Sequence, residues 1–323
     1  MSIANLLEVR NLRVWFPIRR LFKEPLFVRA VDGVSFDLRR GETLAIVGES
    51  GCGKTTLGKA CLRLVEPTSG SILYDGRDIT SIPDKELKWY RREAQIIYQD
   101  PFSSLNPFFT VYKILEEPLI VNEVGDDRSE LVYKALEDVK LTPIEEFVGK
   151  YPHMLSGGQR QRVAIARALI LKPRFVVADE PVSMLDVSVR VEILYLLKEL
   201  QERYGIAFLY ITHDIATVKY FSDRIGVMYA GNFVESGLIK TVVSDPLHPY
   251  TKALIEAIPD PDPKNRFVER KVVAGEPPNP IDIPPGCRFH PRCPYAMPVC
   301  REREPILGEV EKDRYVACWL YDR

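Results

Sequence analysis

The glycine-rich run GESGCGKT, from Gly48 to Thr55, has the composition of a loop that holds a phosphate chain. It fits the pattern GxxxxGK[ST], in which backbone N–H groups wrap the β-phosphate. Lys54 would reach the β- and γ-phosphates, and the Thr55 hydroxyl would bind Mg²⁺. The run follows an apolar segment that predicts a strand and precedes one that predicts a helix, which is the context the motif requires. The predicted nucleotide-contacting residues are Gly48, Glu49, Ser50, Gly51, Cys52, Gly53, Lys54, Thr55 and Thr56.

Two carboxylates end another apolar run, Phe175–Ala178, and could do the hydrolytic chemistry. We expect Asp179 to hold Mg²⁺ through water and Glu180 to polarise an attacking water as general base. Paired acids after a strand can also form a solvated turn. Active sites of open α/β sheets lie at the carboxyl ends of strands, which favours the catalytic interpretation.

Single polar residues follow two further apolar runs. Gln99 follows 96–98 and could reach Mg²⁺ or the attacking water, whereas His213 follows 206–212 and could contact the γ-phosphate. The alternatives are a polar loop residue and a structural histidine. Both sites lie at the predicted carboxyl end of a strand, as Lys54 and Glu180 do, so we favour the functional roles.

The run Leu155-Ser156-Gly157-Gly158-Gln159 predicts a second anion site. Ser156 can cap a helix, and the two glycines let backbone approach a ligand closely. A helix N-terminus with free N–H groups attracts anions. Because a separate loop already cradles phosphate, this second site is predicted to face the nucleotide of a partner chain.

The segments that must position these residues alternate between strands and helices, which predicts an α/β sheet. The basic and aromatic stretch 16–27 is predicted as a loop, and 101–155 as helices broken at Pro118, Pro143 and Pro152. The expected strands are Leu6–Phe16, Val28–Leu38, Thr43–Val47, 96–99, 175–178 and 206–211, and the expected helices are 54–64 and 159–170.

Composition indicates a globular chain with a sizeable core, since 46% of the 323 residues are hydrophobic and 28% are charged. A net charge of −1 argues against a broad nucleic-acid surface. No run reaches the ~18 consecutive apolar residues of a membrane helix, and the N-terminal residues lack a signal-peptide pattern. We therefore expect a cytosolic protein whose membrane role would need a spanning partner.

The C-terminal stretch differs in composition, because 14 of the 25 prolines lie from Pro246 onward. It holds Cys287, Cys293, Cys300 and Cys318. In a reducing compartment such a cluster favours metal over disulfides. Their spacing fits neither paired zinc motifs nor a ferredoxin run, so zinc and iron–sulfur stay equally open, and four free buried thiols are the alternative.

Together these motifs resemble the nucleotide-binding subunit of an ABC transporter, across roughly residues 5–240. GESGCGKT resembles the Walker A, Gln99 the Q-loop, LSGGQ the signature, VVADE the Walker B, Ser183–Asp186 the D-loop and His213 the switch histidine. The resemblance implies a P-loop NTPase of ABC type, with a mixed-sheet core and a helical signature subdomain at about 100–170. It implies ATP hydrolysis, Gln99 as a further Mg²⁺ ligand, and two ATPs sandwiched between two subunits, each facing Ser156–Gln159 and Asp186 of the other chain. The aromatic that stacks on adenine aligns with Phe16, and Trp15 is its rival.

The remaining motifs resemble the ATPases of oligopeptide/dipeptide importers. These are QDPFSSLNP at 99–107, HPYTKAL at His248–Leu254, GCRFHPRCP at Gly286–Pro294 and VACWL at Val316–Leu320, and 63–79 resembles the F-type of the two paired subunits. This implies a nucleotide-binding domain at 1–245 and a small Pro-rich extension at 246–323. It also implies a 4Fe–4S cluster on Cys287, Cys293, Cys300 and Cys318, with zinc as the alternative and His290 as a possible substitute ligand.

The same resemblance implies the partners and the location. It predicts a second ABC ATPase subunit, most simply as a heterodimer with a homodimer as the alternative, together with two membrane-spanning permeases and an extracellular solute-binding protein. No nucleic-acid partner is expected, and the protein would lie at the cytoplasmic face of the cell membrane. Peptide is the expected cargo, and oligosaccharide or nickel are alternatives. A soluble ABC-type ATPase acting on nucleic acid is a weaker alternative, because the chain has one P-loop and no coiled-coil insertion.

Overall fold

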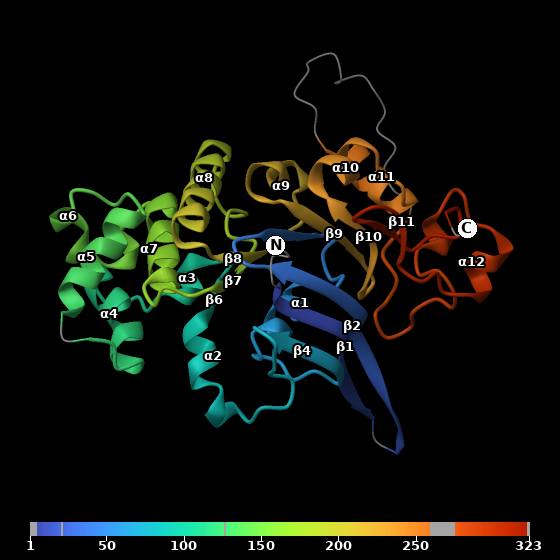
Figure 1. Ribbon diagram of the computed structural model, residues 1–323, viewed down its shortest axis with the longest axis horizontal. Coiled ribbons are helices and arrows are strands. Elements are labelled where there is room, and N and C mark those ends of the chain that lie inside the picture. Colours follow the sequence, from blue (N-terminus) through green and yellow to red (C-terminus); the bar gives the residue numbers. More distant parts are fainter. Residues whose placement is uncertain (1–4, 21, 126, 259–274, 322–323) are drawn as a thin grey trace, which may run out of the picture. The chain divides into compact units, whose positions relative to one another are not determined.

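The computed structural model (Figure 1) describes residues 5–20, 22–125, 127–258 and 275–321. The chain divides into two compact units. The first unit comprises residues up to Leu6, Leu38–Thr43 and Ser81–Tyr210, and the second comprises Leu7–Asp37, Leu44–Thr80 and the chain from Ile211 onward.

The first unit is a helical region attached to parallel strands. Strands β6 and β7 pair in parallel, with Ala94 opposite Phe175 and Ile97 opposite Ala178, and β8 follows in the strand order. Helices α4, α5 and α7 pack against one another and gather together in Figure 1. The elements are η1 (Asp84–Glu86), α2 (Lys88–Glu93), β6 (Ala94–Ile97), α3 (Pro101–Ser104), α4 (Val111–Val121), α5 (Arg128–Asp138), α6 (Glu145–Val148), η2 (Pro152–Met154), α7 (Gly157–Leu169), β7 (Phe175–Asp179), α8 (Val187–Tyr204) and β8 (Ala207–Thr212).

The second unit contains most of an antiparallel sheet, in the order β2-β1-β4-β5, and a mixed set of strands in the order β11-β12-β10-β9-β3. Strands β3 and β9 are parallel, whereas β9, β10, β12 and β11 are successively antiparallel. The elements are β1 (Asn5–Arg20), β2 (Lys23–Arg39), β3 (Thr43–Val47), α1 (Lys54–Cys61), β4 (Ser69–Tyr74), β5 (Arg77–Asp78), α9 (Ile215–Phe221), β9 (Arg224–Tyr229), β10 (Asn232–Leu238), α10 (Ile239–Ser244), α11 (Pro249–Glu256), η4 (His290–Arg292), α12 (Pro298–Glu302), β11 (Gly308–Glu311) and β12 (Arg314–Val316).

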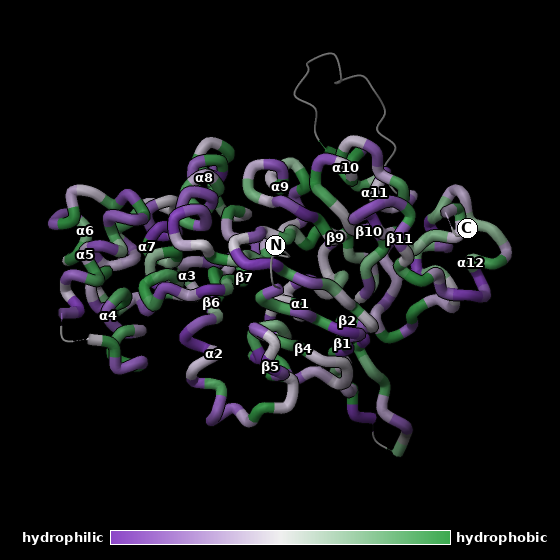
Figure 2. Tube along the Cα trace, viewed as in Figure 1, coloured by the Kyte–Doolittle hydropathy of each residue, from purple (hydrophilic) through white to green (hydrophobic). Residues whose placement is uncertain are grey.

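The core follows from the apolar runs in the sequence. Every residue of β3, β7 and β8 is buried, as expected for strands covered on both faces. The helices, by contrast, carry both hydrophilic and hydrophobic residues along their length (Figure 2), because each buries only one face. None of the described helices is long and apolar enough to span a membrane.

Two sequence predictions about these elements were wrong. Residues 16–27 were expected to form a loop, but β1 continues to Arg20 and β2 begins at Lys23, so most of the described residues of this stretch belong to two neighbouring strands. The last residues of β1, including Arg19 and Arg20, are exposed, so this part of the strand does not show the alternating burial that would have predicted it. Pro118 was expected to break a helix, but it lies inside α4. The neighbouring helices α5 and α7 hold α4 in place despite the missing N–H.

The C-terminal stretch joins the second unit through its backbone as well as its side chains. Glu235 of β10 lies opposite Val316 of β12, and the Ala317 N–H donates to the Val234 carbonyl. Farther up the chain, the Arg29 N–H donates to the Pro280 carbonyl. The described part of the proline-rich stretch is thus held by docking onto the second unit. Residues 259–274 lie outside the described part of the chain.

Candidate nucleotide-binding site

The phosphate loop follows β3 in the second unit, and two of its glycines are required by close contacts. A Cβ at Gly53 would lie 1.9 Å from the Ala30 carbonyl oxygen, and one at Gly48 would lie 2.2 Å from the Met228 carbonyl oxygen. Gly53 also has a φ of 107°, which other residues rarely adopt. The sequence pattern is therefore explained by packing as well as by the phosphate chemistry.

Lys54 begins helix α1 and folds back over this loop. Its Nζ donates to the carbonyl oxygens of Gly48 at 2.7 Å and Glu49 at 2.9 Å, and the residue is only 6% exposed. Its positive charge is thereby held at the loop, where the predicted phosphate contact needs it. The Cys52 Sγ lies 3.8 Å from the same Nζ, and burial raises the pKa of this thiol. Cys52 is therefore a neutral member of the loop and not a nucleophile.

The phosphate loop is also held by side chains far along the sequence. The Glu49 N–H donates to the Tyr250 hydroxyl at 2.9 Å. Arg292 Nη1 and Nη2 donate to the two oxygens of the Glu49 carboxylate at 2.8 and 3.0 Å. Sequence reasoning placed neither Tyr250 nor Arg292 in the site. The available signal was that each lies within one of the C-terminal motifs, His248–Leu254 and Gly286–Pro294.

The two candidate adenine-stacking residues differ in their surroundings. Trp15 donates from Nε1 to Asp32 at 3.1 Å, and the Arg29 guanidinium lies 5.0 Å from the centre of its ring. Phe16, the next residue of β1, therefore points to the other face of the strand and is 40% exposed. These positions leave Phe16 the more accessible ring, and its role stays a prediction.

In the first unit the structure brings Gln99 and Glu180 together. Gln99 lies two residues beyond the end of β6, and Glu180 directly follows β7. The Gln99 Nε2 donates to Glu180 Oε2 at 2.9 Å, because the carboxyl ends of these parallel strands meet. Asp179, the last residue of β7, is buried. Glu180 has a φ of 47°, an unusual conformation for this residue type that commonly marks functional positions.

The signature residues form the N-terminus of helix α7. The Ser156 side chain accepts from the Gln159 N–H at 3.3 Å, and the Gln159 side chain accepts from the Ser156 N–H at 3.0 Å. This reciprocal pair is a capping box. Ser156 and Gly157 are exposed, and a Cβ at Gly158 would come 2.8 Å from the Val189 side chain. Glycine at 158 therefore lets α7 approach the start of α8 closely.

The remaining predicted residues lie where strands or helices end. His213 directly follows β8 and is exposed, and Asp214 after it caps helix α9. Asp186 precedes α8, and Arg190 of that helix donates to the Leu185 carbonyl at 2.7 Å. The D-loop thus has a defined conformation in the first unit.

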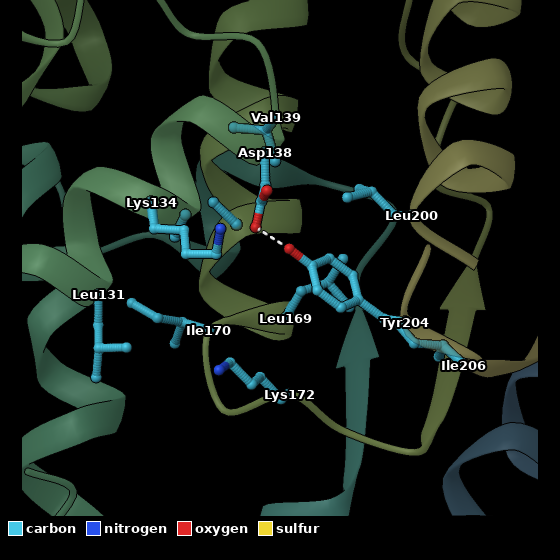
Figure 3. A pocket seen from close by; sticks show the side chains of 12 residues that line it. Leu131, Lys134, Asp138, Val139, Leu169, Ile170, Lys172, Leu200, Tyr204 and Ile206 are labelled. Carbon is cyan, nitrogen blue, oxygen red and sulfur yellow. Dashed lines mark hydrogen bonds between the residues drawn. The ribbon is translucent and has the colours of Figure 1, made fainter. Parts of the chain in front are cut away.

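The first unit also contains a small cavity lined by twelve residues (Figure 3). Its volume of about 30 Å³ compares with the space for about one water. Most of its lining is apolar, and the Tyr204 hydroxyl donates to Asp138 at 2.5 Å across it. None of the predicted site residues lines this cavity, so it is packing space and not a candidate site.

Comparisons with known proteins show which family of proteins this chain resembles. Residues 31–183 match the family model described as ABC transporter, and residues 234–300 match the one described as oligopeptide/dipeptide transporter, C-terminal region. The chain is 46% identical to the oligopeptide transport ATP-binding protein AppF of Bacillus subtilis, over 99% of this chain and 100% of that protein. It is also 46% identical to the dipeptide transport ATP-binding protein DppF of Haemophilus influenzae, over 98% and 97% of the two chains.

The chain belongs to the oligopeptide/dipeptide ABC transporter ATP-binding family. Among solved structures, it resembles the dimeric ABC transporter cassette MJ0796 with a TM-score of 0.63 and 30% identity, covering 72% of this chain and 98% of that one. The predicted ABC-type ATPase with a mixed sheet is confirmed. An ABC-type ATPase uses ATP and Mg²⁺, so these two predicted cofactors stand as well.

The described part of the structure does not show the metal site predicted for the C-terminal cysteines of this ABC-family chain. Within the described residues, no group of three or more His, Cys, Asp or Glu side chains could hold a metal ion. A structural zinc would need four ligands within about 2.3 Å of one point. The predicted metal site, whether as a 4Fe–4S cluster or as zinc, is therefore not shown among these residues, and the His290 Nδ1 lies 2.9 Å from the Cys287 carbonyl oxygen, to which it can only donate.

The four thiols nevertheless lie near one another. The Cys287 N–H donates to the Cys300 carbonyl at 2.8 Å. Burial, together with the smaller effect of negative charge on Cys300, Cys318 or Cys293, raises the pKa of the Cys287 thiol to about 11. Such mutual influence requires the sulfur atoms to share one small region of the second unit.

Proposed function

We propose that this chain hydrolyses ATP to drive peptide import through an ABC transporter. The observation that carries the catalytic part is the Gln99–Glu180 pair at the carboxyl ends of two buried parallel strands. A carboxylate there can accept a proton from water, and the amide can orient that water. The names of AppF and DppF, which cover nearly the whole chain, support peptide as the cargo; oligosaccharide and nickel are the alternatives.

The chemistry assigns one role to each predicted residue. Backbone N–H groups of Gly48–Thr56 and the Lys54 ammonium bind the phosphates, and Phe16 stacks on adenine. Thr55, Gln99 and Asp179 are the proposed Mg²⁺ ligands, either directly or through water. Glu180 is the general base, and His213 contacts the γ-phosphate as charge develops on it.

We propose that a second chain completes each ATP site. Ser156–Gln159 and Asp186 would face the ATP bound by the partner, because Ser156 and Gly157 are exposed at the N-terminus of α7, where a helix attracts anions. MJ0796 was solved as a dimer. The preferred partner is a second ABC ATPase in a heterodimer, and a homodimer is the alternative.

The complex would further contain two membrane-spanning permeases and, indirectly, an extracellular solute-binding protein. The chain would then lie peripherally at the cytoplasmic face of the cell membrane. Phe102 and Phe108 are exposed next to Gln99, 63% and 86% respectively, which supports a contact between this segment and a permease. Arg160 lies 3.6 Å from the centre of the Phe102 ring, and it also donates to the Leu155 carbonyl. A contact at Phe102 could thereby reach the signature helix.

We also propose that the chain divides into a nucleotide-binding domain at 1–245, with a helical signature subdomain at about 100–170, and a C-terminal extension at 246–323.

We further propose that Cys287, Cys293, Cys300 and Cys318 hold a 4Fe–4S cluster, which would cross-link the proline-rich stretch. A cluster gives each thiolate its own iron, so the four sulfurs need not converge on one ion. Anaerobically purified protein should then contain about four irons per chain and absorb broadly in the visible range. Colourless, iron-free protein would exclude the cluster.

Glu180→Gln tests the catalytic proposal. This variant should bind ATP with the affinity of the unmodified chain but turn it over at least about 100-fold more slowly, the usual contribution of a general base. Glu202→Gln is a matched control, because it removes an exposed carboxylate of α8 in the same unit. Unchanged turnover in Glu180→Gln would show that another group activates the water.

A further inference from the structure

The phosphate loop is braced by the C-terminal part of the second unit. Helix α1 and strand β3 hold the two ends of the loop, whereas Glu49, near its start, is held by Tyr250 and Arg292. Both Tyr250 and Arg292 lie within residues 234–300, which match the C-terminal family model. The general P-loop chemistry does not require either of them.

Tyr250 is built into the interior. It is 0% exposed, and its hydroxyl accepts the Glu49 N–H. Its ring lies 4.6 Å from that of Tyr229 and 5.4 Å from that of Phe289, measured between ring centres. Phe289 also lies 5.2 Å from Tyr229. The packed aromatic rings thus hold the Tyr250 hydroxyl in place, and this hydroxyl orients the Glu49 N–H.

Arg292 holds the Glu49 side chain with a two-pronged contact. Its side chain is 6% exposed, and its guanidinium also approaches the Tyr229 hydroxyl at 3.4 Å. Two parallel N–H···O bonds to one carboxylate give both strength and a defined geometry. Arg292 also neutralises the carboxylate, which would otherwise carry a negative charge next to the predicted triphosphate.

We propose that Arg292 and Tyr250 are positioning residues for the nucleotide phosphates. They fix the start of the phosphate loop through Glu49, so that its N–H groups are already aligned when ATP or ADP binds. The inference rests on the proposed ATPase function and adds to it that the C-terminal extension forms part of the nucleotide site. Preorganisation of this kind acts on affinity, because it lowers the cost of ordering the loop.

The test compares Arg292→Gln, Tyr250→Phe and the control Arg301→Gln. Like Arg292, Arg301 is next to a cysteine in the C-terminal stretch, so its replacement removes the same charge. Unlike Arg292, its side chain is exposed. We expect KM for MgATP and Kd for MgADP to rise about tenfold in Arg292→Gln and about threefold in Tyr250→Phe, since each loses hydrogen bonds that order the loop. We expect kcat to change less than about twofold, and Arg301→Gln to behave as the unmodified chain.

A double variant separates position from charge. In Glu49→Gln/Arg292→Gln the carboxylate and its partner are both neutral, and we expect the weak affinity of Arg292→Gln to persist. Full recovery would overturn the positioning role, because Arg292 would then act only by cancelling charge. An unchanged KM in both single variants, or a fall in melting temperature and kcat with KM unchanged, would also overturn it. If the unmodified chain bound no MgADP, the proposed function itself would fail.

Discussion

The phosphate loop and the signature loop are both glycine-containing anion sites, but they are built differently. The phosphate loop is held on all sides within the second unit: Gly53 lies against Ala30, Gly48 against Met228, and Glu49 is clamped by Arg292. The signature loop is held mainly by its own residues, through the Ser156–Gln159 capping box, and it exposes Ser156 and Gly157.

This difference indicates which of the two loops can act within one chain and which needs a second chain. A loop fixed from several directions can bind a ligand without rearrangement, whereas an exposed helix N-terminus offers N–H groups to whatever approaches it. The phosphate loop therefore suits ATP binding by one chain. The signature loop suits a contact made on association.

The largest expected effect comes from the phosphate loop. Lys54→Ala removes a buried ammonium that lies against the Gly48 and Glu49 carbonyls, so ATP affinity should fall by about two orders of magnitude, the equivalent of a lost charged hydrogen bond. Equilibrium binding of a fluorescent ATP analogue measures this. Lys59→Ala, on the same helix, is the control. Affinity that survived in Lys54→Ala would mean that the loop does not hold the phosphates.

A smaller and different effect is expected at the signature loop. Ser156→Ala should leave ATP affinity unchanged, lower the ATPase rate of the associated protein about tenfold, and cost roughly 1 kcal/mol of stability through the lost cap. Thr110→Ala removes the cap of α4 in the same unit and should cost similar stability without loss of rate. Chemical unfolding and ATPase rates distinguish the two variants. Equal ATPase rates in the two variants would show that Ser156 does no more than cap its helix.

The smallest expected effect is a pH dependence of stability that comes from His248, next to the residues that hold the phosphate loop. His248 caps α11, which carries Tyr250, by accepting the Tyr250 N–H, and burial lowers its pKa from 6.5 to about 3. The unfolded chain thus binds a proton below pH 6.5 that the folded chain does not, so stability is lost as pH falls from 6.5 towards 3. The Glu235 carboxylate accepts the His248 backbone N–H at 2.9 Å.

Between pH 7 and pH 6 this histidine should contribute a loss of about 0.7 kcal/mol in unfolding free energy. His248→Asn keeps a cap acceptor without a titrating group, so its stability should fall less over the same interval. Urea unfolding at the two pH values measures the difference. Identical pH dependence of both proteins would contradict a neutral buried histidine.

The sequence predicted the features that depend on local patterns. The strand, glycine loop and helix around Gly48–Lys54 follow from short-range rules, and Gln99 meets Glu180 because apolar runs reveal parallel strands whose ends must coincide. It did not reveal the extended strands at 16–27 or the helix through Pro118, where pairing and packing outweigh local preference. Nor could spacing alone show that Arg292 reaches Glu49, because that contact depends on the docking of a distant segment.

The central claim is that one chain binds ATP but needs a second chain to hydrolyse it. The most direct measurement is the ATPase rate per chain over a range of concentrations, with oligomeric state followed by light scattering, for the unmodified chain and Ser156→Arg. We predict that the monomer binds ATP with negligible turnover, that turnover appears on association with itself or with a second ATPase, and that Ser156→Arg abolishes this gain without weakening binding. A monomer that hydrolyses ATP at full rate, unaffected by Ser156→Arg, would contradict the account.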